Sequence, residues 1–148
     1  MTLDRASTRF AALALVLVAL LAQSARMRRL VGANQRLRAV ELTSIAAAGQ
    51  GERAAPLLSA NLAVLRDAER MDPAEVGLRV ARGSVYFLLG RMDQAIAGYE
   101  SALRLEPRPE IYFNIGRAKL AQGDPVAANV ALARAVRIDP KLTKHLPE

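Results

Sequence analysis

The residue types that most often perform catalysis are scarce in this chain of 148 residues. It has no Cys, and its single His is His145. A cysteine nucleophile, a thiolate metal site, a His-based metal cluster and a Ser-His-Asp triad are therefore excluded. The sequence also lacks phosphate-binding glycine loops, a zinc-protease motif and a calcium loop. We expect no catalytic residue, no metal site, no cofactor and no small-molecule substrate.

The distribution of the charged side chains bears instead on which partners the protein could bind. The net charge is +7, and residues 1–38 hold seven Arg against one acid, Asp4. Residues 39–148 are nearly neutral, and aromatic residues make up only 4% of the chain. Nucleic-acid binding usually needs a basic folded face or stacking aromatics. We therefore consider nucleic acid an unlikely partner, and keep binding of nucleic acid or anionic lipid through Arg26–Arg38 only as an alternative.

Residues 10–25 form an apolar run without charge, and three arginines follow it directly, namely Arg26, Arg28 and Arg29. Two interpretations compete. The first is a transmembrane helix whose flanking arginines lie at the membrane surface. The second is a secretory signal that is cleaved after the run, which would leave an exported soluble protein. We favour the membrane anchor, because a secretory signal should turn neutral where this cluster begins.

The arginines also bear on orientation. More of them follow the apolar run than precede it, and positive charge concentrates on the cytoplasmic side of single spans. The richness in Ala and Arg is typical of a bacterial protein. We expect a single-pass protein of the bacterial inner (cell) membrane, with the following domain in the cytoplasm in preference to the periplasm.

Helical patterning continues beyond the expected span and a short N-terminal tail at residues 1–9. Residues 26–48 read as a basic amphipathic stalk or first helix, with one apolar stripe formed by Leu30, Ala33, Leu37 and Val40. Glycines at 49 and 51 break the pattern, and a second helix is expected over residues 53–70. Together these segments predict a degenerate helical hairpin at residues 37–73.

A repeat with a period of 33 residues follows. Small residues, turn glycines and closing prolines recur in pairs: Gly83 and Gly116, Gly90 and Gly123, Ala95 and Ala128, Ala102 and Ala135, Pro107 and Pro140. We expect two antiparallel helices per unit, in close contact at the small residues. Glycine permits the turn and proline ends the unit. Asp72 and Asp124 are each expected to cap the helix that follows.

The pattern resembles the tetratricopeptide repeat (TPR) family. The unit beginning at Val76 matches the consensus at Gly83, Tyr86, Ala95, Tyr99, Ala102 and Pro107. The unit beginning at Pro109 matches it at Tyr112, Ile115, Gly116, Ala128, Ala135 and Pro140. Arg79, Arg82 and Lys119 depart from it. The resemblance implies an all-α fold, an N-terminal transmembrane helix followed by a short TPR-like solenoid, with repeats at residues 74–107 and 108–140 and a tail at 141–148.

The resemblance further implies that the first helix of each repeat faces a concave groove. The expected peptide-binding residues are Val80, Ser84, Phe87, Phe113, Arg117 and Leu120. A lysine/asparagine clamp for a carboxylate is missing, because Val80 and Ser84 stand at its first positions. An apolar helix or extended peptide with an acid near Arg117 fits better. The alternative is that Phe87 and Phe113 pack between the repeats as core.

These observations indicate a non-enzymatic, membrane-anchored adaptor or scaffold. It would hold membrane-associated protein partners, assemble a membrane complex, or act as an accessory subunit. The exported soluble protein remains the alternative. The last helix, at residues 126–138, is apolar nearly all round, so we expect one of its faces to lie uncovered.

Overall fold

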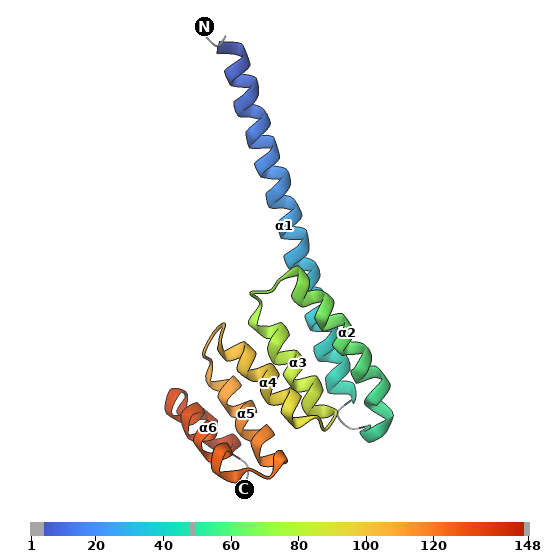
Figure 1. Cartoon of the computed structure of the whole chain (residues 1–148), viewed down its shortest axis with the longest axis vertical. Helices are drawn as coiled ribbons and strands as arrows, with labels where there is room; N and C mark the ends of the chain where they lie inside the picture. Colours follow the sequence, from blue (N-terminus) through green and yellow to red (C-terminus); the bar gives the residue numbers. More distant parts are fainter. Residues whose placement is uncertain (1–4, 48–49, 147–148) are drawn as a thin grey trace.

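The computed structural model describes residues 5–47 and 50–146, without the side chains of residues 5–12 and 51–52. Every element in this part of the chain is helical (Figure 1). The elements are α1 (Arg5–Ala47), η1 (Gly51–Ala54), α2 (Ala55–Met71), α3 (Val76–Leu88), α4 (Met92–Leu103), α5 (Pro109–Gln122), α6 (Pro125–Ile138) and η2 (Pro140–His145). The all-α prediction is confirmed.

The helices pair into three hairpins that stack in chain order. The pairs are α1 with α2, α3 with α4, and α5 with α6, and each hairpin packs on the next (Figure 1). The first helices of successive hairpins also touch, since α1 contacts α3 and α3 contacts α5. Three first helices therefore lie along one side of the stack.

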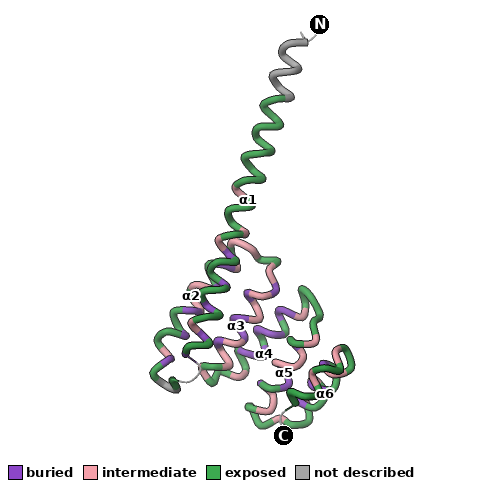
Figure 2. The backbone as a smooth tube through the Cα atoms, turned by 180° about the vertical axis from the view of Figure 1, so that it is seen from behind, coloured by how far each residue is buried: buried purple, intermediate pink, exposed green. Residues whose placement is uncertain are grey.

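Helix α1 is one continuous helix of 43 residues. It begins within the expected tail at 1–9 and runs without a break through the expected span and stalk. Its C-terminal half packs on α2 and α3 through the predicted stripe, because Ala33, Leu37 and Val40 are buried. Residues 13–24 form an exposed stem that projects from the repeats (Figure 2). Residues 33–47 thus belong to the first hairpin, and they include the α1 part of the hairpin expected at residues 37–73.

The expected transmembrane helix at residues 10–25 is not confirmed. Among the helices of the described part of the chain, none is both long enough and apolar enough to cross a membrane. The whole uncharged run at residues 10–25 rises about 24 Å as a helix, whereas the hydrocarbon core measures ~30 Å. Residues 10–12 lie outside the described side chains.

The helix caps correct one prediction and confirm another. Asp72 does not cap α3, because α3 begins only at Val76 and Asp72 Oδ1 accepts instead from the Ala74 N–H in the preceding turn, at 3.3 Å. Glu75 is the cap, and its Oε1 accepts from the Gly77 N–H at 3.0 Å. Asp124 caps α6 as predicted, since its Oδ1 accepts from the Ala127 N–H at 3.0 Å.

The two repeats use glycine in the same way. A Cβ on Gly83 would lie 2.6 Å from the Tyr99 ring, and a Cβ on Gly116 would lie 2.6 Å from Leu132. Gly83 and Gly116 are equivalent positions, and so are Tyr99 and Leu132. The absence of a side chain therefore lets the second helix of each hairpin lie against the first, as predicted. Gly90 and Gly123 adopt φ values of 72° and 86°, which turn the chain between helices.

Two of the departures from the repeat consensus, Arg79 and Arg82, have partners in the first hairpin or the turn after it. Arg82 Nη1 lies 2.8 Å from Glu69 Oε2 on α2, and both side chains are largely buried. Its Nη2 donates to Ser101 Oγ on α4 at 3.3 Å. Arg79 Nη2 donates to the Pro73 carbonyl at 2.7 Å. The substitutions at Arg79 and Arg82 thus tie α3 to the segment before it.

The C-terminal end of the stack is partly covered. The expected tail at 141–148 includes η2, which packs on α6. Val126 and Val130 on α6 remain 75% and 69% exposed, so the prediction of an uncovered face holds.

Candidate functional site

The expected site residues Val80 and Ser84 line a hollow between α3 and α1, with a volume of about 350 Å³. Its other walls are Val40, Glu41, Ser44, Ile45 and Ala81. The four α1 residues are not among the expected site residues, because the groove positions follow from the repeat consensus, which covers only residues 74–140. The apolar stripe that ends at Val40 could have indicated these residues, because it shows which side of α1 faces the repeats.

The hydroxyl groups in this hollow already have partners within the protein. Ser84 Oγ donates to the Val80 carbonyl at 3.1 Å and accepts from the Tyr99 hydroxyl at 3.2 Å. Ser44 Oγ accepts from the buried Asn61 side chain at 3.2 Å. Burial raises the pKa of the Tyr99 phenol, while its bond to Ser84 and the charge of Arg117 act in the opposite direction. The oxygens of both hydroxyl groups thus have hydrogen-bond partners inside the protein.

Two other expected site residues meet across the next repeat boundary. The Arg117 guanidinium lies over the Phe87 ring, 5.1 Å from its centroid. Phe87 is half-buried and packs against the core cluster of α4 and α5, which agrees with the core interpretation for this residue. Arg117 is exposed. Phe113 and Leu120 are half-buried on the same helix as Arg117. The structure thus brings together Val80 with Ser84, and Phe87 with Arg117.

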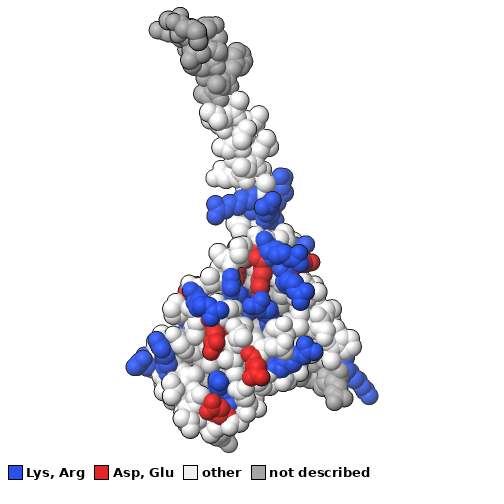
Figure 3. Space-filling view, viewed as in Figure 1, with Lys and Arg blue, Asp and Glu red and all other residues white. Residues whose placement is uncertain are grey.

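The expected membrane-surface residues Arg26, Arg28 and Arg29 lie exposed on α1 at the base of the stem. Figure 3 shows basic side chains on the visible face of the helix, between its uncharged segment and the repeats. Arg26 and Arg29 also line a hollow of about 550 Å³ beside Leu30 and the turn between α2 and α3.

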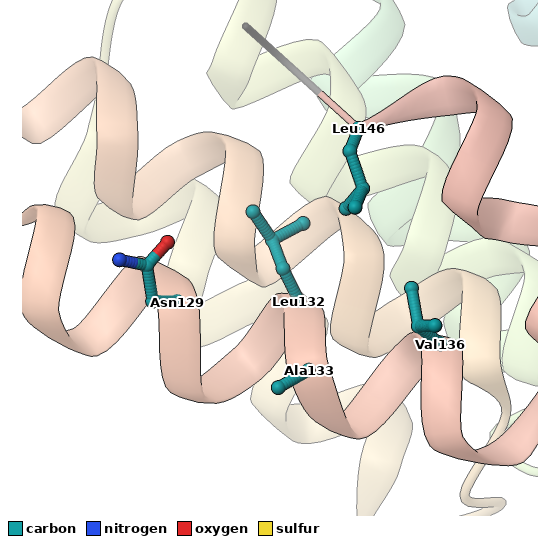
Figure 4. Close-up of a pocket in the computed structure, with 5 residues that line it drawn as sticks. All are labelled: Asn129, Leu132, Ala133, Val136 and Leu146. Carbon is teal, nitrogen blue, oxygen red and sulfur yellow. The ribbon is translucent and has the colours of Figure 1, made fainter.

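A further hollow of about 340 Å³ lies at the C-terminal end (Figure 4). Leu132 and Val136 on α6 and Leu146 after η2 point toward one another across it. Among the described residues, no group of three or more His, Asp or Glu side chains is placed to hold a metal ion.

Stacked antiparallel hairpins with small residues at their crossings define a helical-repeat protein. The model of the TPR repeat matches residues 83–123, and a second model of the tetratricopeptide repeat matches residues 109–142. Residues 83–142 are therefore TPR repeats. The α1–α2 hairpin lies outside both matched ranges.

A similar solved structure is also a TPR protein. The crystal structure of a thermophilic TPR protein from Thermus thermophilus is similar to this chain, with 36% identity and a TM-score of 0.62. The similarity covers 68% of this chain and 54% of that one, so the chain spans about half the length of the relative. No curated protein matches the chain.

Proposed function

We propose that this protein is a non-enzymatic adaptor that binds protein partners along the side formed by α1, α3 and α5. TPR repeats typically mediate protein–protein interactions. The observation that carries the proposal is the hollow between α1 and α3, because it joins the expected site residues Val80 and Ser84 to an apolar wall. Partner contact would continue over Phe87, Phe113, Arg117 and Leu120.

Chemical crosslinking of the tagged full chain in cells tests this proposal. We expect Arg117→Glu and Phe113→Ala to remove the same partner from the crosslinked set. Arg66→Glu is the matched charge reversal, because Arg66 is exposed in the middle of α2. The adaptor proposal fails if the partner set is the same for wild type, Arg117→Glu and Phe113→Ala while circular dichroism shows each chain folded.

A second proposal concerns the stem. Large apolar side chains at residues 13, 15–18, 20 and 21 are exposed at successive positions around the helix. A single groove or one partner helix would cover only one side, whereas lipid surrounds a helix on all sides. Arg26, Arg28 and Arg29 suit the level of anionic headgroups. We propose that the stem enters a bilayer from its surface, which would tether the adaptor at the bacterial inner membrane with its repeats on the cytoplasmic face.

Flotation with vesicles checks the tether. The full chain should float with vesicles that contain phosphatidylglycerol, and Leu17→Glu combined with Leu20→Glu should abolish flotation. Replacement of the three arginines by Gln should weaken flotation and leave the repeats folded. A chain isolated from cells without about its first 24 residues, as judged by intact mass, would instead support the exported protein. Retention of nucleic acid by the same arginines, with no flotation, would support the nucleic-acid alternative.

A further inference from the structure

The hollow between α1 and α3 has one charged residue in its wall, Glu41. Glu41 is exposed, and within the described part of the chain no basic side chain lies within ion-pair distance of it. The remaining wall is apolar or consists of the two serines whose hydroxyls are engaged inside the protein. The hollow therefore offers an apolar surface and one unpaired negative charge.

The apolar part of this wall is accessible from outside. Ile45 is 73% exposed, whereas Val40 beneath it is buried. A volume of about 350 Å³ is at the lower end of the range of ligand pockets, which runs from roughly 300 to 1,000 Å³. It suits one large apolar side chain better than a cofactor, because the engaged hydroxyls leave few groups to orient a polar ligand.

We propose that this hollow receives an apolar side chain of a partner protein while Glu41 pairs with a lysine or arginine next to it. The inference rests on the proposed adaptor function and specifies its partner as a basic-apolar segment. Charge complementarity selects this occupant, since an acidic segment would place like charges together at Glu41. The site lies between α1 and α3, and Ser84 alone among its lining residues falls within a matched repeat range.

Selection of random linear peptides on phage, with the full chain as bait, tests this pairing. Enriched peptides should carry Lys or Arg beside Leu, Ile, Phe or Met. A synthetic copy of the best peptide should lose roughly tenfold or more in affinity for Glu41→Arg. The peptide with its cation changed to Glu should bind Glu41→Arg better than wild type. Glu100→Arg is an equal charge reversal at an exposed position on α4, and it should leave the affinity unchanged.

Other outcomes overturn the pairing. Enriched peptides without a cation, an affinity that Glu41→Arg leaves unchanged, or the absence of any enriched peptide would each do so. Dimerisation of the chain that Glu41→Arg abolishes would assign the hollow to a second copy. Peptides that respond only to Arg117→Glu and Phe113→Ala would remove this inference and keep the adaptor proposal. Loss of the adaptor proposal itself is recognised in the crosslinking experiment, by a partner set that is the same for wild type, Arg117→Glu and Phe113→Ala.

Discussion

Arg117 on α5 places its guanidinium over the ring of Phe87 on α3, so a cation of one repeat rests on an aromatic residue of the preceding repeat. The contact joins two expected site residues that are 30 positions apart in the chain. It also gives Phe87 two roles, because the ring packs on the core cluster of α4 and α5 with one part and holds Arg117 with another.

A double-mutant cycle should detect this contact. We expect Phe87→Leu and Arg117→Gln to show a coupling of about 0.5–1 kcal/mol in the free energy of unfolding, because a cation over an exposed aromatic face contributes that much. Urea unfolding followed by circular dichroism provides the measurement. Phe87→Leu combined with Arg66→Gln is the control and should be additive. Equal additivity in both cycles would contradict the contact.

The equivalent glycines should respond alike to an added methyl group. Gly83→Ala and Gly116→Ala should each lower the free energy of unfolding by about 1–3 kcal/mol, because the new Cβ meets Tyr99 or Leu132 at 2.6 Å. Gly32→Ala is the matched control within α1. Its nearest neighbour is the flexible end of Met71, at 3.1 Å, and alanine favours a helix by about 0.5–1 kcal/mol. Thermal unfolding that ranks Gly32→Ala with the other two would argue against the close helix crossings.

The Arg82–Glu69 pair should depend on both partners. Arg82→Leu should lower the free energy of unfolding by about 1–3 kcal/mol, because it leaves the Glu69 carboxylate largely buried without its cation. Addition of Glu69→Leu should recover most of this loss. Urea unfolding of both variants measures the recovery. A double variant as unstable as Arg82→Leu alone would show that the cost has another origin.

Tyr99 should make stability fall at high pH. Its pKa is raised by burial, so the folded state keeps the phenol protonated after the unfolded chain begins to ionise near pH 10.0. The contribution of Tyr99 is therefore complete below pH 10.0 and is lost as the pH rises through the folded pKa. Tyr99→Phe should flatten the decline in the free energy of unfolding above pH 10.0. Ser84→Ala is the control, because it removes the hydrogen bond and keeps the phenol, and it should retain the decline. Equal slopes for Tyr99→Phe and wild type would contradict the assignment.

The repeats could be predicted because their determinants recur locally. Gly83 and Gly116 stand at equivalent places, and glycine followed by a spaced small residue predicts a close helix crossing without any long-range information. Turn glycines such as Gly90 act through their own backbone conformation. The family resemblance could also indicate which faces of α3 and α5 line the groove, because those faces follow from local positions within each repeat.

Cap assignment depended on a detail beyond local sequence. Asp72-Pro73-Ala74-Glu75 contains two residues able to accept from a helix N-terminus. Asp72 is the wrong choice, because its Oδ1 accepts from the Ala74 N–H in a turn that precedes α3, and α3 begins only at Val76. The turn between α2 and α3 thus decided which residue caps α3.

The sequence alone determined the helical class, the repeat register and the arginine cluster at residues 26–29, since these follow from composition and short spacings. Tertiary structure decided that α1 passes from stem to first hairpin and that Glu41 stands beside Val80 and Ser84. The physical reason is that Glu41 and Ser84 are far apart in the chain. Only the packing of α1 on α3, through buried side chains such as Leu37, brings them to one hollow.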